Sequence, residues 1–260
     1  RHTRFKCDWS SDVCSSDLFF DDDPVNREYV RINLPQVQTI ELPQDPSEFA
    51  NILKHLNEFS VLKITQEDQQ RGKMYAEQRK RTDLEKSSPD LQGFLKQLNL
   101  RVLIKIANDF TIPRISQLTL KTNQFNLTTK RYQESDIKKF AQDKDYLVGC
   151  AQVEDKFGDN GITGVFIVNK KNPKEWYLDT FLLSCRVMGR EVEKGILSYV
   201  IGKAKNSGAQ QLRAQFVPTL KNKPIEEFLP KCGFKKESDS WVYSVNVPFE
   251  IPNCLTISAE

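Results

Sequence analysis

Residues 179–193 read DTFLLSCRVMGREVE, and this stretch decides the predicted fold. It joins the end of an apolar run at 176–186, which predicts a buried strand, to a helix that we expect over about residues 190–207. Gly208 follows that helix as its C-cap, because glycine readily adopts the left-handed backbone that ends a helix. A strand that turns directly into a helix favours an α/β fold.

The elements around this stretch predict one α/β domain over residues 99–248, followed by a tail at 249–260. Along the chain, the expected order of elements is β, α, α, β, β, β, α, β, α, β. This order is similar to that of the GNAT acyltransferase fold, which has a mixed central sheet. The expected strands are 100–107, 146–154, 162–169, 176–186, 211–217 and 241–247, and the expected helices are 113–125, 136–141, 190–207 and 224–231.

The strand-to-helix turn resembles the GNAT motif R/QxxGxG/A, whose backbone amides face the pyrophosphate of acyl-CoA at a helix N-terminus. Arg186 and Gly189 match its first two landmarks, but Glu191 stands where Gly or Ala is usual. A carboxylate there repels a phosphate and adds bulk, which argues against acyl-CoA binding. Arg186 and Gly189 are therefore candidates for acyl or phosphate binding, with a purely structural turn as the alternative.

Two later positions bear on the same resemblance. Asn222 fits the asparagine that GNAT enzymes often carry and is a third candidate for acyl or phosphate binding. The tyrosine that acts as acid toward the leaving thiolate is replaced by Leu229, which cannot donate a proton, and Pro230 follows it. We interpret Cys232 as a packing residue.

A polar block lies between the first two expected elements of this domain, where GNAT folds line the acceptor site. Lys121, Asn123, Gln124 and Asn126 are the acceptor-site candidates. Amide side chains both donate and accept hydrogen bonds, as a polar acyl group or a pantetheine arm would need. The alternative is that they cap a helix and a loop.

The segment before this domain predicts a strand at 19–23, a helix at 25–34 that Pro24 opens, and a strand at 37–42. Together they indicate the stub of a parallel α/β unit over residues 19–45. A helical connector at 46–98 follows. Its basic run, Arg79 to Arg81, is expected on a solvated helix face.

Composition excludes several classes of function. Of 260 residues, 38% are hydrophobic and 28% charged, which is typical of a folded globular protein. The 38 Lys and Arg against 35 Asp and Glu leave a net charge of +3, too small to indicate nucleic acid or an anionic membrane as partner. No apolar run approaches the roughly 18 residues of a membrane span.

Residues 1–18 resemble a translated sequencing adapter, so we exclude them from fold reasoning. Without them one histidine remains, His55, which we expect on a helix surface. Four cysteines also remain, at 150, 185, 232 and 254. They contain no CxxC pair, so neither a zinc site nor a redox motif is indicated, and a reducing cytoplasm fits best.

Five blocks in order resemble FkbH-like proteins, which join a HAD-type class IIIC phosphatase domain to a C-terminal GNAT-like domain. The blocks are FFDDDPVNRE at 19–28, LKTNQFNLTTKRY at 120–132, DKFGDNG at 155–161, DTFLLSCRVMGREVE at 179–193 and PTLKNKP at 218–224. The resemblance implies a fold class of α/β: a HAD-like stub, a helical connector and a GNAT-like domain.

The same resemblance implies a function. Members of this family dephosphorylate a phosphorylated three-carbon acyl donor and load the glyceryl group onto an acyl carrier protein for polyketide-type biosynthesis. FFDDDPVNRE resembles the later acidic motif of HAD enzymes, so Asp21 and Asp22 would help to hold Mg²⁺ in the full-length parent, since two carboxylates suit a hard cation. Acyl-CoA or phosphopantetheine are the other candidate ligands.

Two alternatives compete for the GNAT-like domain itself. One is a non-catalytic module that recognises a carrier protein, and the other is an acyl-CoA-dependent N-acyltransferase.

We expect the chain, as an inactive fragment, to hydrolyse no phosphate ester, because the HAD nucleophile motif would lie upstream of Phe19. The measurement is turnover of p-nitrophenyl phosphate with Mg²⁺. A rate above background would refute the expectation.

Overall fold

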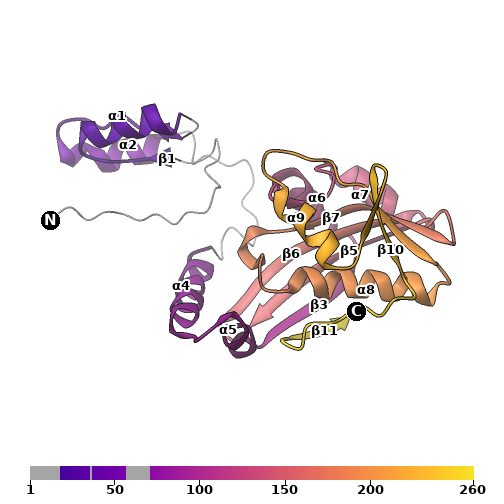
Figure 1. Ribbon diagram of the computed structural model, residues 1–260. Helices are drawn as coiled ribbons and strands as arrows, with labels where there is room; N and C mark the ends of the chain where they lie inside the picture. The colour runs from indigo at the N-terminus through magenta and orange to yellow at the C-terminus, as the bar shows by residue number, and fades with distance from the viewer. Residues whose placement is uncertain (1–17, 36, 57–70) are drawn as a thin grey trace. The chain divides into compact units, whose positions relative to one another are not determined.

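The structure is a computed structural model that describes residues 18–35, 37–56 and 71–260. The chain divides into two compact units, Arg1–Thr65 and Gln66–Glu260. Figure 1 colours them along the chain, from indigo in the smaller unit to yellow at the C-terminus.

The smaller unit contains a short parallel strand–helix–strand arrangement. Strand β1 pairs in parallel with β2, and the Ile40 amide extends the pairing by donating to the Phe19 carbonyl (3.0 Å). Helix α1 begins at Pro24 because the Asp23 side chain accepts from the Val25 amide (2.8 Å) and caps the helix. The elements are β1 (Leu18–Phe19), α1 (Pro24–Asn33), β2 (Gln38–Thr39), the 3-10 helix η1 (Pro46–Glu48) and α2 (Phe49–His55).

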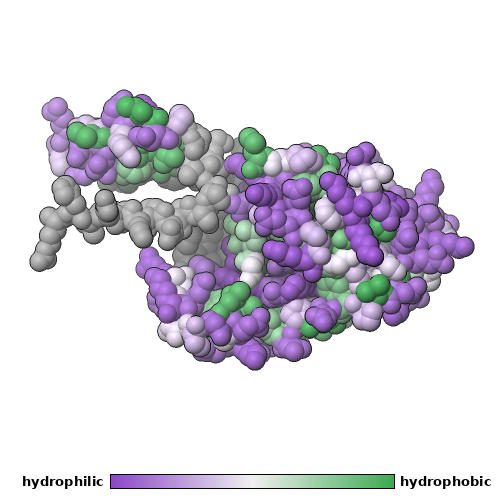
Figure 2. All heavy atoms as spheres, viewed as in Figure 1, coloured by the Kyte–Doolittle hydropathy of each residue, from purple (hydrophilic) through white to green (hydrophobic). Residues whose placement is uncertain are grey.

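The apolar face of α1 is not buried within this unit. Val25, Tyr29 and Ile32 are all exposed, and Figure 2 shows hydrophobic atoms on the visible surface of the smaller unit. The buried residue of α1 is Arg27, whose guanidinium donates to the carbonyls of Asp21 (2.8 Å) and Asp22 (3.0 Å). Arg27 therefore fixes the turn between β1 and α1.

The described part of the larger unit forms a nine-stranded sheet in the order β11-β3-β5-β6-β7-β8-β10-β9, with β4 paired to β7. The pairs β7–β8 and β3–β11 are parallel and the others are antiparallel, so the predicted mixed central sheet is confirmed. The strands are β3 (Leu100–Ile106), β4 (Phe125–Asn126), β5 (Tyr146–Asp155), β6 (Gly158–Asn169), β7 (Glu175–Leu183), β8 (Gln211–Ala214), β9 (Lys235–Glu237), β10 (Ser240–Ser244) and β11 (Leu255–Ala259).

Helices cover both faces of this sheet. Alternate residues of β7 enter two separate apolar cores, with Phe181 and Leu183 in one and Leu182 in the other. The first core packs under α5, α8 and α9, and the second under α6 and α7; Figure 1 shows α8 lying across one face. The helices are α4 (Arg71–Ser87), α5 (Leu91–Leu98), α6 (Ile112–Lys121), α7 (Glu134–Gln142), the 3-10 helix η3 (Cys185–Val187), α8 (Val192–Asn206) and α9 (Lys223–Lys231).

The predicted elements from β3 to β10 are observed in their order, together with two short strands that were not predicted, β4 and β9. The expected tail contains β11, which pairs in parallel with β3 at the sheet edge. Helices α4 and α5, expected in the connector, belong to the larger compact unit. Helix α5 contributes Phe94, Leu95 and Leu98 to the core of this unit.

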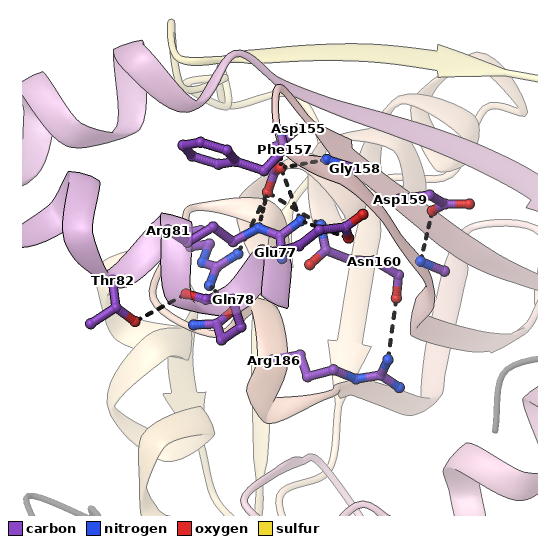
Figure 3. Close-up of polar contacts among 12 residues, drawn as sticks. Glu77, Gln78, Arg81, Thr82, Asp155, Phe157, Gly158, Asp159, Asn160 and Arg186 are labelled. Atoms are coloured by element: carbon purple, nitrogen blue, oxygen red, sulfur yellow. Dashed lines mark hydrogen bonds and ion pairs between the residues drawn. The ribbon is translucent and has the colours of Figure 1, made fainter. Parts of the chain in front are cut away.

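A buried ion pair fastens α4 to the hairpin between β5 and β6 (Figure 3). Arg81 donates from Nε and Nη2 to the two Asp155 oxygens, at 2.6 and 3.0 Å. Both side chains are almost fully buried, so the expectation of a solvated face for Arg81 is corrected. The charge partner lies 74 residues away along the chain, and a helical pattern cannot reveal it.

Asp155 also organises the hairpin turn. Its carboxylate accepts from the amides of Phe157 (2.9 Å) and Gly158 (3.3 Å) and from the Asn160 side chain (3.3 Å). Burial alone would raise the pKa of Asp155, but the hydrogen bonds from Arg81 and Phe157 outweigh it and hold the pKa below its ordinary value.

Gly158 provides a test of this docking. Its φ is +153°, and a Cβ added there would overlap the Glu77 carboxylate of α4. We expect Gly158→Ala to lower the free energy of unfolding by about 1–3 kcal/mol, because an alanine is strained at this φ and the buried Glu77 side chain must move. The control is Gly202→Ala in α8, where an added Cβ meets nothing within 4 Å. This change should raise stability by roughly 0.5–1 kcal/mol. Urea denaturation measures both, and equal midpoints for Gly158→Ala and the parent would contradict the packing.

Candidate functional site

The candidate site lies where β7 and β8 separate. Their parallel pairing ends at Leu178 and Ala214, while β7 continues to Leu183. At this point Asp179 is an extra residue in β7, because the register with β6 steps from Thr180 opposite Ile167 to Leu178 opposite Val168. Such a bulge bends and twists its strand. Beyond it, the buried edge of β7 needs hydrogen-bond partners other than β8.

The chain's own residues 125–128 provide these partners. Strand β4 pairs antiparallel with the last residues of β7. The Leu127 amide then donates to the Phe181 carbonyl (3.0 Å), and the Leu127 carbonyl accepts from the Val217 amide (3.0 Å). Leu127 is fully buried and joins the chain after β8 to β7. Residues 125–128 therefore fill the gap as a short internal strand, which we call the gap segment.

Asn222 locks the gap segment in place. It is fully buried, and its Nδ2 donates to the carbonyls of Asn126 and Val217, both at 2.9 Å. Its Oδ1 accepts from the Thr219 amide (2.7 Å). We therefore revise the expectation of acyl or phosphate binding for Asn222, because both ends of its amide are bonded to backbone groups.

Asn126 has a similar structural role. Its side chain donates to the Thr122 carbonyl and accepts from the Thr129 amide, both at 3.0 Å, and Thr129 has a positive φ of 52°. Of the acceptor-site candidates, Asn126 is fully buried and bonded to backbone, which is a correction to that expectation.

The other acceptor-site candidates lie outside the gap. Lys121 and Asn123 are exposed, and Gln124 is half-buried. Asn123 accepts a hydrogen bond from Arg131. The structure therefore does not gather the four candidates around one ligand site.

Apolar side chains fill the space beside the gap segment. The Phe125 ring meets Phe181 edge-on at a centroid distance of 6.0 Å and Phe228 at 5.3 Å. Leu229, at the position of the expected tyrosine, is fully buried in the same core. The packing here is that of a protein interior.

One polar cluster at the bulge escaped the sequence analysis. The Asp179 carboxylate accepts from the Tyr132 hydroxyl (2.8 Å), pairs with Lys130 and bonds the Thr180 hydroxyl (3.0 Å). Burial and the bond to Asp179 raise the pKa of Tyr132, so this phenol stays protonated and keeps donating. Asp179 is the first residue of the stretch 179–193, but no sequence pattern links it to Lys130 and Tyr132, which lie about 50 residues earlier.

The turn before α8 has two residues with positive φ, Gly189 at +77° and Glu191 at +65°. Gly189 is exposed, and a Cβ there would meet nothing within 4 Å. Glu191 pairs with Lys194 at 2.5 Å, and the Arg186 guanidinium donates to the Asn160 carbonyl at 3.4 Å. The neighbouring residue, Arg190, is buried and turned inward.

Arg190 connects this turn to the ion pair that holds α4. Its guanidinium lies 3.9 Å from the Asp155 carboxylate and donates to the Gln78 side chain at 3.3 Å. Asp155 thus stands between two arginines, Arg81 and Arg190. Arg186 lies near the same network through Asn160 (Figure 3).

The described residues of the smaller unit do not by themselves form the magnesium site that the resemblance implies. The Asp21 carboxylate accepts from the Asp23 amide (2.8 Å) and the Asn26 side chain (3.2 and 3.3 Å), and Asp22 is exposed. Among the described residues, no group of three or more His, Cys, Asp or Glu side chains could hold a metal ion. We derive no metal-dependent step from this chain.

None of the helices in the described ranges combines the length and the apolar character needed to cross a membrane.

The chain was compared with family models, curated proteins and solved structures. No family model matches the chain, and no curated protein matches it. Solved structures that match include the IAA acetyltransferase from Bacillus cereus, which is 20% identical, with 53% of this chain and 79% of that chain covered at a TM-score of 0.39.

A spermidine N-acetyltransferase variant from Vibrio cholerae is 10% identical, with 56% and 94% covered at a TM-score of 0.44. A Mycobacterium tuberculosis protein in complex with CoA is 15% identical, with 52% and 72% covered at a TM-score of 0.40. Similarity at this level does not establish function.

Glu193, in the first turn of α8, gives a pH-dependent test. Burial raises its pKa from an ordinary 4.5 to about 7, and its Oε2 is buried without a hydrogen-bond partner among the described residues. The folded protein therefore holds this proton more tightly than the unfolded chain. The contribution to stability is complete below about pH 4.5 and is lost as pH rises to about 7.

We expect Glu193→Gln to exceed the parent in free energy of unfolding by about 1–3 kcal/mol at pH 8 and to match it near pH 4.5. The control is Glu226→Gln on the exposed face of α9, which should change stability by less than about 0.5 kcal/mol at either pH. A Glu193→Gln protein that is less stable than the parent at pH 8 would contradict the buried charge.

Proposed function

We propose that the larger unit is the GNAT-like module of an FkbH-like enzyme and that it recognises an acyl carrier protein without using acyl-CoA. The observation that carries the exclusion of acyl-CoA, and leaves recognition of the carrier to the protein surface, is the gap segment. An extended, amide-bearing arm can join a buried sheet only where backbone groups are unpaired. In the gap between β7 and β8, the Leu127 amide and carbonyl already bond Phe181 and Val217.

Two further residues support the part of the proposal that excludes acyl-CoA. Glu191 places a carboxylate at the turn where a pyrophosphate would sit. Leu229 is buried in the core at the position where a proton donor to a leaving thiolate would be needed.

The FkbH-like part of the proposal is supported by the five sequence blocks and by the parallel strand–helix–strand of the smaller unit. In such a parent the phosphorylated three-carbon donor would be processed by the phosphatase domain. The larger unit would then bring the carrier protein to it. In this role its residues bind and orient the partner and carry out no bond-breaking step.

A CoA-dependent acyltransferase is the second candidate, and the turn at 186–191 favours it. Gly189 leaves open space next to the N-terminus of the 15-residue helix α8, where an anion would be stabilised. Glu193, in the first turn of α8 and with its pKa raised by burial to about 7, would then be a candidate to move a proton.

Calorimetry separates the two candidates. We titrate the chain with acetyl-CoA and with an acyl carrier protein in its holo and apo forms, and we follow thiol release from acetyl-CoA with an amine acceptor. The proposal predicts a Kd for acetyl-CoA weaker than about 1 mM, no thiol release, and carrier binding at micromolar Kd.

The second candidate predicts micromolar binding of acetyl-CoA that falls by about tenfold or more in Gly189→Glu. Gly202→Glu, which adds the same charge on α8 where nothing lies within 4 Å, is the matched control. Thiol release together with that pattern would overturn our proposal. If neither acetyl-CoA nor the carrier protein binds, the carrier-binding part of our proposal is overturned.

A further inference from the structure

The loop before α9 exposes Leu220 to solvent, and hydrogen bonds within residues 219–222 fix its backbone. Leu220 is fully exposed. The Thr219 hydroxyl accepts from the amides of Lys221 (3.3 Å) and Asn222 (3.2 Å), and Asn222 bonds back to the Thr219 amide. These bonds hold Leu220 outward.

A second loop is clamped against the first. Asn222 bonds the Asn126 carbonyl, and Asn126 in turn bonds the Thr122 carbonyl at the end of α6. Arg131 also donates to the Thr122 carbonyl (3.2 Å). This chain of hydrogen bonds places the residues around 120–122 and 131 next to the loop at 217–222.

The two loops together carry cations and exposed apolar side chains. The residues of this loop surface are Leu120, Lys121, Arg131, Leu220, Lys221 and Lys223, all of them exposed. Among the described residues, the one ion pair that involves its cations joins Lys223 to Glu227 at 4.0 Å. Lys130, close by, is neutralised by Asp179.

We propose that the loop surface docks an acidic amphipathic helix of a partner protein, with Leu220 in contact with an apolar side chain of that helix. Four cations around exposed leucines complement a helix that carries carboxylates beside an apolar stripe. The net charge of the whole chain is only +3, and the surface includes no aromatic side chain for base stacking, so nucleic acid fits less well. The inference rests on the proposed function only in naming the carrier protein as the source of that helix.

The test compares two double charge reversals. In one, Lys221→Glu is combined with Lys223→Glu on the loop surface. In the control, Arg79→Glu is combined with Lys80→Glu, because both residues are exposed on α4. The probes are holo acyl carrier protein and a synthetic acidic amphipathic peptide, titrated at low and high salt.

We expect the loop variant to weaken carrier binding about tenfold or more, Leu220→Ser to weaken it about fivefold, and the control to change it less than about twofold. Binding should also weaken as salt rises. Equal losses in the loop variant and the control would overturn the proposal, as would tighter binding of an RNA oligonucleotide or of anionic vesicles than of either acidic probe.

The peptide separates this inference from the proposed function. If the parent binds the peptide but no carrier protein, and the loop variant loses the peptide, the loop surface stands while the carrier assignment fails. If neither probe binds the parent, the loop surface is refuted. Urea midpoints of all variants within experimental error of the parent show that the losses are not due to unfolding.

Discussion

The separation of two parallel strands governs this structure. Once β7 and β8 part after Leu178 and Ala214, the buried backbone of β7 needs new partners, and the chain supplies them from residues 125–128. The cost is local: Asn222 must be buried with both ends of its amide bonded, and a bulge must form at Asp179. The same arrangement closes the part of the sheet where an extended ligand could pair, and it braces the loops that carry the exposed cations.

A second constraint is the buried carboxylate of Asp155. An uncompensated charge in an interior is costly, so its position obliges Arg81 to reach it from α4 and Arg190 to approach it from the turn before α8. One carboxylate thus joins three segments that are distant in the sequence. The turn at 186–191, which resembles an anion site, is consequently tied to the interior through Arg190 and Asp155. Glu191 pairs with Lys194 in the same region.

Much of the fold was predictable because it depends on local patterns. The start of α1 at Pro24 and the end of α8 before Gly208 follow from capping preferences, and the structure has both close to the expected places. The apolar run that predicts a strand to Arg186 gives β7, which ends at Leu183, because Cys185–Val187 form the 3-10 helix η3. The site was less predictable because its contacts are long-range. Asn126 and Asn222 lie 96 residues apart, and the Asn222 side chain donates to the Asn126 carbonyl, a contact that no local spacing indicates.

Amide hydrogen exchange tests most directly whether the gap segment fills the space between β7 and β8. If residues 125–128 fill the space between β7 and β8, the amides of Leu127 and Val217 should exchange as slowly as those within β5 and β6, since both donate to buried carbonyls. The amide of Asn123, an exposed residue, serves as the fast reference. Exchange of Leu127 and Val217 at the rate of Asn123 would show that the gap stands open, and it would contradict the account.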